Sequence, residues 1–102
     1  MNRIFSPLSL LIVLAVASPA AAAAPAGEKL FKEKCAMCHK VRGNGGVLGP
    51  ELTKVGATLG EQALREQLAN PKKKNPNTTM PSFKSLPARD LDALVAYLKD
   101  LK

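Results

Sequence analysis

Large hydrophobic residues recur at helical spacing in three separate parts of this chain. The clearest part lies near the C-terminus, where they repeat every three or four positions. Pro87 fits the first turn of such a helix, and Asp90 and Asp92 complement the positive end of its dipole. The repeating positions are Leu91, Leu94, Val95, Leu98 and Leu101.

A second helix is predicted to begin at Thr58, which has capping-box spacing to Glu61. Leu64 and Leu68 are four residues apart and therefore share one face of this helix. The Asn70-Pro71 pair stops it, because a residue before proline is pushed out of the helical region.

A further helix, the first along the chain, is predicted from about Glu28 to Cys38, with Leu30 and Phe31 on its inner face. A stretch rich in glycine then breaks regular structure between residues 43 and 50. No segment alternates as a strand does. The pattern therefore predicts a small all-α domain of three to four helices.

The N-terminal residues have the pattern of a secretory signal. Arg3 supplies a positive charge, a short apolar run follows over 8–17, and the alanines at 20–24 offer small-residue cleavage sites. We expect a cleaved signal peptide over 1–23, export to the periplasm, and one domain over 24–102.

An uncleaved membrane anchor is the alternative for this segment. Residues 4–26 carry no charge and are numerous enough to cross a bilayer. Pro7, Pro19 and Pro25, together with the run of alanines, argue against a continuous spanning helix. Removal of the signal would leave no span in the mature protein.

Charge indicates the kind of partner. The chain has 15 basic and 8 acidic residues, a net charge of +7, and loss of Arg3 with the signal leaves +6. Lys72, Lys73 and Lys74 form the longest basic run of the chain. In most proteins such a run is simply part of a solvated loop. Nucleic acid is a poor candidate partner, because the chain is exported and lacks aromatic platforms for bases.

The strongest chemical signal is Cys35-Ala36-Met37-Cys38-His39. A Cys-x-x-Cys-His sequence attaches a c-type haem: each thiol adds to one vinyl group, and the histidine becomes an axial ligand of the iron. These are the only two cysteines and the only histidine of the chain. One covalently bound haem c is therefore expected, and its apolar face would enlarge the limited core of a domain of about 80 residues.

Three other uses of these residues are weaker. A structural zinc site needs four ligands, and only Cys35, Cys38 and His39 are available. A redox dithiol usually lies in a βαβ context, which this sequence does not show. A Cys35–Cys38 disulfide would close a very small loop and stabilise little.

Met80 is the candidate for the second axial ligand. It lies in a segment, 75–83, whose asparagines and prolines indicate a structured loop. Met1 leaves with the signal, and Met37 is fixed between the cysteines on the His39 side. The plainer alternative is that Met80 only fills a gap in the core. With haem present, a thioether ligand would raise the reduction potential relative to a second histidine.

With these residues in place, the chain resembles the class I c-type cytochromes in their small bacterial monohaem form, over roughly 27–101. The attachment motif alone is common, but its combination with other motifs in this order is specific. Besides 35–39, the matching residues are Gly27, Phe31, Gly49-Pro50-Glu51-Leu52, Asn70-Pro71-Lys72, Thr78-Thr79-Met80-Pro81 and Leu94-Val95-Ala96-Tyr97-Leu98.

The resemblance implies roles for several residues. The Pro50 carbonyl would accept a hydrogen bond from Nδ1 of His39, and Gly27, Phe31 and Tyr97 would form the crossing of the first and last helices. The family-like fold would wrap around the haem, with the basic run beside its exposed edge to steer acidic-surfaced redox proteins.

Two departures from the longer mitochondrial relatives concern the haem surroundings. Leu59 stands where those relatives place a propionate-bonding tryptophan, which leaves the hydrogen bonding of the propionates open. Gln67 stands where they place a tyrosine near the methionine sulfur, so it could replace that hydrogen bond or simply be solvated.

The function expected from this resemblance is that of a monomeric periplasmic one-electron carrier with His39 and Met80 as axial ligands. A haem subunit permanently docked on a dehydrogenase or oxidase is the alternative. An enzyme with an open iron site is disfavoured, because the only histidine is already committed to the proximal side.

Overall fold

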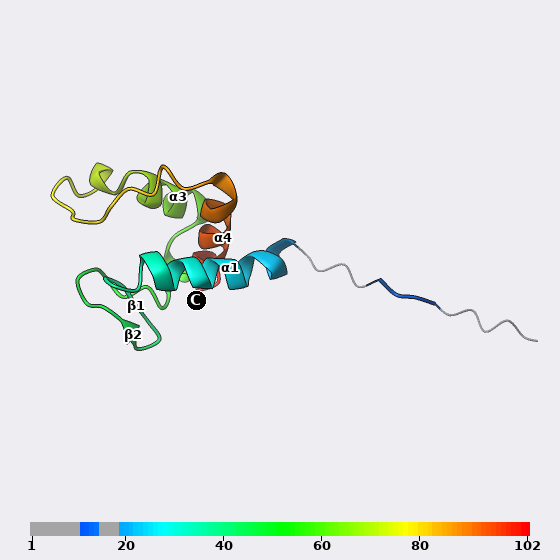
Figure 1. Ribbon diagram of the computed structural model, residues 1–102. Coiled ribbons are helices and arrows are strands. Elements are labelled where there is room, and N and C mark those ends of the chain that lie inside the picture. Colours follow the sequence, from blue (N-terminus) through cyan, green and yellow to red (C-terminus); the bar gives the residue numbers. More distant parts are fainter. Residues whose placement is uncertain (1–10, 15–18) are drawn as a thin grey trace, which may run out of the picture.

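The computed structural model describes residues 11–14 and 19–102 (Figure 1). Its helices are α1 (Pro19–Lys34), α2 (Val55–Thr58), α3 (Glu61–Ala69), the 3₁₀ helix η1 (Pro71–Lys73) and α4 (Ala88–Lys99). A small hairpin of β1 (Lys40–Val41) and β2 (Asn44–Gly45) lies between α1 and α2. The all-α prediction is confirmed apart from this hairpin. No helix among the described residues is long and apolar enough to cross a membrane.

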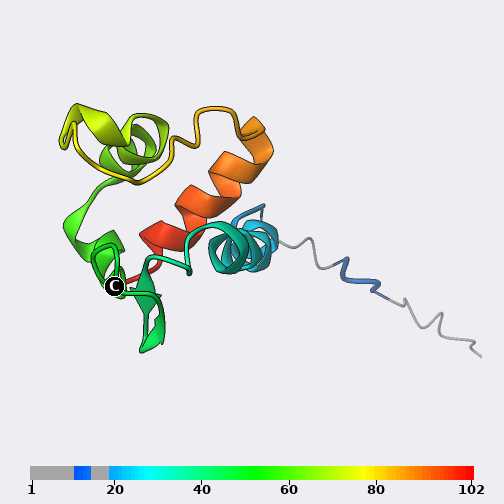
Figure 2. The same cartoon turned by 60° about the vertical axis from the view of Figure 1, so that its left-hand side comes forward.

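The first and last helices cross at close range, as Figures 1 and 2 both show. Gly27 makes this approach possible: a Cβ atom at this position would collide with the Ala93 carbonyl oxygen and with Cβ of Tyr97. Beside it the rings of Phe31 and Tyr97 lie 5.4 Å apart, tilted by 49°. The crossing implied by the resemblance is therefore confirmed.

The hydrophobic core forms where α1, α3 and α4 meet. Leu94, Val95 and Leu101 are almost completely buried, so the predicted C-terminal stripe does face inward. Leu101 follows the end of α4, and its carbonyl accepts a hydrogen bond from the Gly56 N–H at 2.6 Å. This bond fixes the C-terminus against α2.

The predicted boundaries of two helices were wrong. The first helix extends from Pro19 and ends at Lys34 instead of Cys38, because residues 35–38 turn. Thr58 is not an N-cap: its hydroxyl donates back to the Val55 carbonyl at 3.1 Å, and Gly60 caps α3 instead. The predicted stop after Ala69 is confirmed.

The hairpin was missed because its strands are too short to alternate. Lys40 pairs with Gly45 and Val41 with Asn44, which leaves Arg42 and Gly43 as a two-residue turn. Both have positive φ, 49° and 82°, as a type I′ turn requires. Arg42 has no glycine-like freedom, and its N–H is held by the Thr53 hydroxyl at 2.9 Å.

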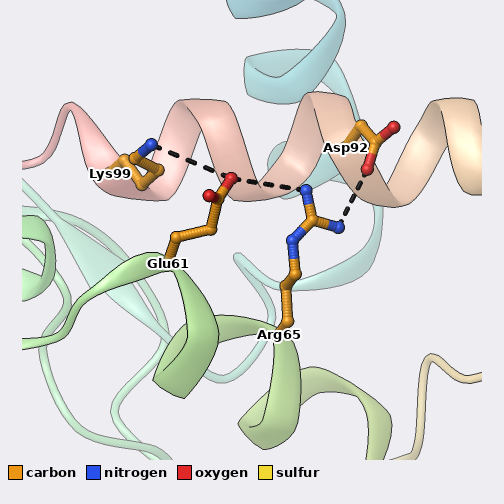
Figure 3. Close-up of polar contacts among 4 residues, drawn as sticks. All are labelled: Glu61, Arg65, Asp92 and Lys99. Atoms are coloured by element: carbon orange, nitrogen blue, oxygen red, sulfur yellow. Dashed lines mark hydrogen bonds and ion pairs between the residues drawn. The ribbon is translucent and has the colours of Figure 1, made fainter.

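Ion pairs tie α3 to α4 on the outside of the domain (Figure 3). Arg65 on α3 donates to Asp92 on α4 at 2.8 Å and pairs with Glu61 at 3.4 Å. Lys99 approaches Glu61 at 3.8 Å. Each exposed pair contributes at most about 1 kcal/mol, but together they link the two helices. Because α3 also lines the cavity described below, these ties help to position one of its walls.

The predicted export signal falls mostly on residues 1–10 and 15–18, outside the described residues. Its central four residues, 11–14, are described and lie 73–86% exposed. These four residues therefore lie outside the core of the domain.

Candidate haem-binding site

One cavity of about 680 Å³ opens between the attachment motif and the loop that carries Met80. Cys35, Cys38 and His39 contribute to its lining from one segment, and Met80 contributes from another. Leu64, Leu68 and Leu98 supply apolar surface from α3 and α4. A largely apolar cavity with a few polar groups is the usual form of a cofactor site.

The ring of His39 is held in one orientation. Its Nδ1 lies 2.7 Å from the Pro50 carbonyl oxygen. A carbonyl can only accept, so Nδ1 carries the proton and Nε2 keeps a free lone pair. Gly49 allows this placement, since a Cβ there would strike the imidazole ring. The role that the resemblance implied for Pro50 is confirmed.

The two cysteines are free thiols in the turn after α1. The N–H groups of Cys38 and His39 both donate to the Cys35 carbonyl, at 3.1 and 2.9 Å. This tight turn brings all three side chains to the cavity lining. Burial raises the pKa of Cys35 to about 11. A reactive dithiol needs a lowered pKa, so this environment disfavours the redox-dithiol interpretation.

The loop that carries Met80 is anchored to α3 at its far end. The Phe83 N–H donates to the Leu68 carbonyl at 2.8 Å, and the Ser82 hydroxyl donates to the Ala69 carbonyl at 2.6 Å. Met80 itself is partly buried, and its N–H is bound by the Thr78 hydroxyl at 3.2 Å. These bonds fix the thioether at the cavity.

Gln67 contacts the Met80 sulfur directly. Its side-chain Nε2 donates to Sδ of Met80 at 3.7 Å, a distance consistent with a hydrogen bond to sulfur. The sequence left open whether Gln67 makes this bond or is solvated, and the structure decides for the bond. The amide dipole therefore points its positive end toward the thioether.

The residues present fit a haem. The cavity combines apolar surface, one imidazole with a free Nε2, two thiols and one thioether. Polar groups that sequence reasoning did not assign also reach the lining, from Lys54, Asn75 and Thr78. They are candidates to donate hydrogen bonds to the haem propionates. Leu59, which stands where the longer relatives place a propionate-bonding tryptophan, lines the same cavity. Only the folded arrangement reveals them, because their spacing in sequence carries no motif.

Comparison with known proteins gives consistent results. The family model described as Cytochrome c matches residues 24–102. Cytochrome c of Gossypium barbadense is 39% identical over 100 residues, covering 76% of this chain and 88% of that protein. Cytochrome c of Gibberella zeae is 37% identical over 95 residues, covering 72% and 90%.

A structural neighbour supports the fold alone. The crystal structure of SoxXA from P. pantotrophus superposes with a TM-score of 0.70 at 22% identity, covering 78% of this chain and 81% of that one. The family model and the sequence matches show that the chain belongs to the class I c-type cytochromes, a family that transfers electrons through covalently bound haem.

Proposed function

We propose that this protein is a periplasmic one-electron carrier that uses a single haem c with His39 and Met80 as axial ligands. The observation that supports this most is the convergence of the two cysteines, His39 and Met80 on one apolar cavity. The sequence contains one attachment motif and no further cysteine, which supports one haem.

The protein's own groups would each have a defined task in this role. Haem iron, when bound, supplies a centre that alternates between the ferrous and ferric states. Pro50 orients His39 so that Nε2 can face the metal. Leu64 and Leu68 exclude water from the cavity, and Gln67 holds the Met80 sulfur. A fixed ligand set keeps reorganisation small, which suits electron transfer.

The attachment claim is tested by single alanine replacements. Cys35→Ala and Cys38→Ala are each expected to reduce covalent haem and the yield of folded protein, because one thioether bond is lost. Haem-stained denaturing gels measure this directly. Met37→Ala is the matched control, since Met37 stands between the cysteines yet is 85% exposed. Undiminished covalent haem in both cysteine variants would contradict the proposal.

Gln67 is expected to tune the potential. Gln67→Leu should lower it by about 20–60 mV, the equivalent of a net hydrogen bond of about 0.5–1.5 kcal/mol. The amide N–H draws electron density from the sulfur and so favours ferrous iron. Potentiometric titration measures the shift. Gln62→Leu, at an exposed position on the same helix, is the control. An equal reduction potential in both variants would mean that the Gln67 side chain does not influence the iron through Met80.

Export is supported by the N-terminal pattern. Residues 11–14 are exposed apolar side chains. Cleavage after residue 23 would bring Pro25, which lies inside α1, into the first turn, where a missing N–H is tolerated. The intact mass of the purified protein tests this: a mass that includes residues 1–23 would contradict cleavage.

A permanently docked subunit is the second candidate. Subunit 2 of a cytochrome c oxidase from Alkalihalophilus pseudofirmus is 29% identical over 96 residues, which cover 85% of this chain and 28% of that protein. A sequence of this kind can therefore be part of a larger protein. Obligate interfaces bury roughly 2,000 Å² or more and are strongly apolar. The described domain exposes only three large apolar side chains, which favours a carrier that binds transiently.

Acidic redox proteins are the proposed partners. Lys72, Lys73 and Lys74 are exposed at η1 and just after it. Lys74, together with Lys34 and Lys54, also lines the haem cavity. Positive charge at this opening would speed encounter with a partner that carries carboxylates.

A further inference from the structure

The segment between α3 and α4 carries Met80 but buries little of its own surface. It comprises residues 70–87, all of which the structure describes, and Pro71 is the only one of them that is buried. A segment with so little buried surface depends on contacts at its ends to keep its conformation. The place of the Met80 thioether at the cavity therefore depends on how the two ends of this segment are held.

Two hydrogen bonds hold part of the segment against the last turn of α3. The Phe83 N–H donates to the Leu68 carbonyl at 2.8 Å. The Ser82 hydroxyl donates to the Ala69 carbonyl at 2.6 Å. Neither bond involves α4, although the segment leads directly into that helix. Keeping both ends of the segment in place therefore also requires that α3 and α4 stay at a fixed distance.

The two helices run in opposite directions, and ion pairs connect them (Figure 3). Glu61 at the start of α3 pairs with Lys99 at the end of α4, at 3.8 Å. Further along, Arg65 pairs with Asp92 at 2.8 Å. Each of these last two residues lies only five positions from the Met80 segment. Arg65 and Asp92 therefore connect the helices near the base of that segment, and we call them the loop-base pair.

Apolar packing alone does not fix how α3 lies on α4. Leu64 and Leu68 are buried, but burial is non-directional and tolerates small shifts. A hydrogen-bonded ion pair is directional, and the planar guanidinium of Arg65 is also held by Glu61 at 3.4 Å. The Arg65 side chain is 34% exposed, less than the other three charged residues of this network. These features favour the loop-base pair over an isolated surface pair.

We propose that Arg65 is a positioning residue for Met80, because its pair with Asp92 closes the base of the Met80 segment and keeps the thioether at the cavity. This inference rests on the carrier function proposed above, in which Met80 is an axial ligand. Without the pair, α3 and α4 separate more often, and residues 70–87 gain conformations that the closed base excludes. Met80 then leaves its place more often, while both helices stay folded.

Uptake of imidazole by the ferric, haem-loaded protein measures how often Met80 leaves. Imidazole can occupy the sixth position only after the thioether has moved away, so at saturating imidazole the rate reports that opening. Stopped-flow spectra follow it. In Arg65→Gln the rate should be about two- to fivefold higher than in the wild type, the range for a surface pair within a network. Lys32→Gln is the matched control, because it removes the same charge but breaks a pair with Glu28 within α1.

Three further comparisons separate positioning from general stability. Asp92→Asn should act as Arg65→Gln does, and the double variant should be no faster than either single one, because all three lack the same pair. At 1 M salt the wild type should approach the rate of Arg65→Gln, since screening weakens the pair. Gly27→Ala, which disturbs the crossing of α1 and α4, should lower Tm more than Arg65→Gln but accelerate uptake less.

Equal uptake in Arg65→Gln and Lys32→Gln would overturn the inference, as would additive effects in the double variant. An equally large acceleration in Gly27→Ala would also contradict it, because uptake would then follow global stability. Met80→Ala reveals a failure of the proposed function instead, since it should bind imidazole without waiting for an opening step. A wild type that binds as fast as Met80→Ala would refute Met80 as the axial ligand, whatever the Arg65 variants do.

Discussion

Replacing Met80 by alanine is expected to lower the reduction potential of the haem-loaded protein by about 60 mV or more, a tenfold change in a one-electron equilibrium constant. The thioether favours ferrous iron, and alanine cannot replace it. The sixth position should then accept carbon monoxide in the ferrous state, which the wild type should resist. Visible spectra and potentiometric titration measure both effects.

Met37→Ala is the matched control for this change. Met37 is the other methionine of the domain and lies in the attachment turn, where it is 85% exposed. Its replacement should leave the spectrum and the potential unchanged. A Met80→Ala protein with an unchanged spectrum and no carbon monoxide binding would show that another group holds the sixth position, and Met80 would then be only a core residue.

Helices with strong spacing could be predicted from the sequence. The leucine stripe of α4 and the proline before it located this helix closely, because burial of one face and a fixed φ at its start both act locally. The N-cap predicted at Thr58 was wrong because such a cap also depends on a local hydrogen bond. The Thr58 hydroxyl has a competing local acceptor in the Val55 carbonyl, and spacing to Glu61 does not reveal which bond forms.

The haem-binding site likewise has one part that the sequence predicts and one part that only the fold determines. Cys35, Cys38 and His39 are adjacent in sequence, so their grouping at the cavity could be predicted from the motif. Gln67 and Met80 are 13 residues apart, and their contact depends on how the 75–83 loop returns along α3. Neither residue type alone indicates that contact. The resemblance raised it as one of two possibilities, and the structure decides for the hydrogen bond.

The exposure of Val47 and Leu48 could not be predicted from the sequence. Valine and leucine side chains such as those of Val47 and Leu48 are usually buried, because burial is favourable by about 1.5–3 kcal/mol each. Their exposure follows from hydrogen bonds of the Gly46 and Gly49 N–H groups, which hold 46–49 against the attachment turn.

Gly27→Ala is expected to destabilise the protein despite the better helix propensity of alanine. The added methyl would meet the Ala93 carbonyl oxygen, a backbone atom of α4, and Cβ of Tyr97. Neither can rotate away, so the helices must separate and loosen the packing of Phe31 on Tyr97. Overpacking of this kind costs about 1–3 kcal/mol, and propensity returns at most about 1 kcal/mol.

Thermal unfolding of the haem-loaded protein measures this effect, with Gly60→Ala as its control. A net loss of about 1–2 kcal/mol would lower Tm by roughly 4–16 °C in a domain of this size. A Cβ atom at residue 60 would meet no described atom within 4 Å, and the φ of −77° at Gly60 suits any residue. Its replacement should cost only the preference of an N-cap for glycine over alanine, about 0.5–1 kcal/mol, with no overpacking. Equal Tm values for the two variants would mean that α1 and α4 cross with room to spare, and that the glycine at position 27 is not what sets their approach.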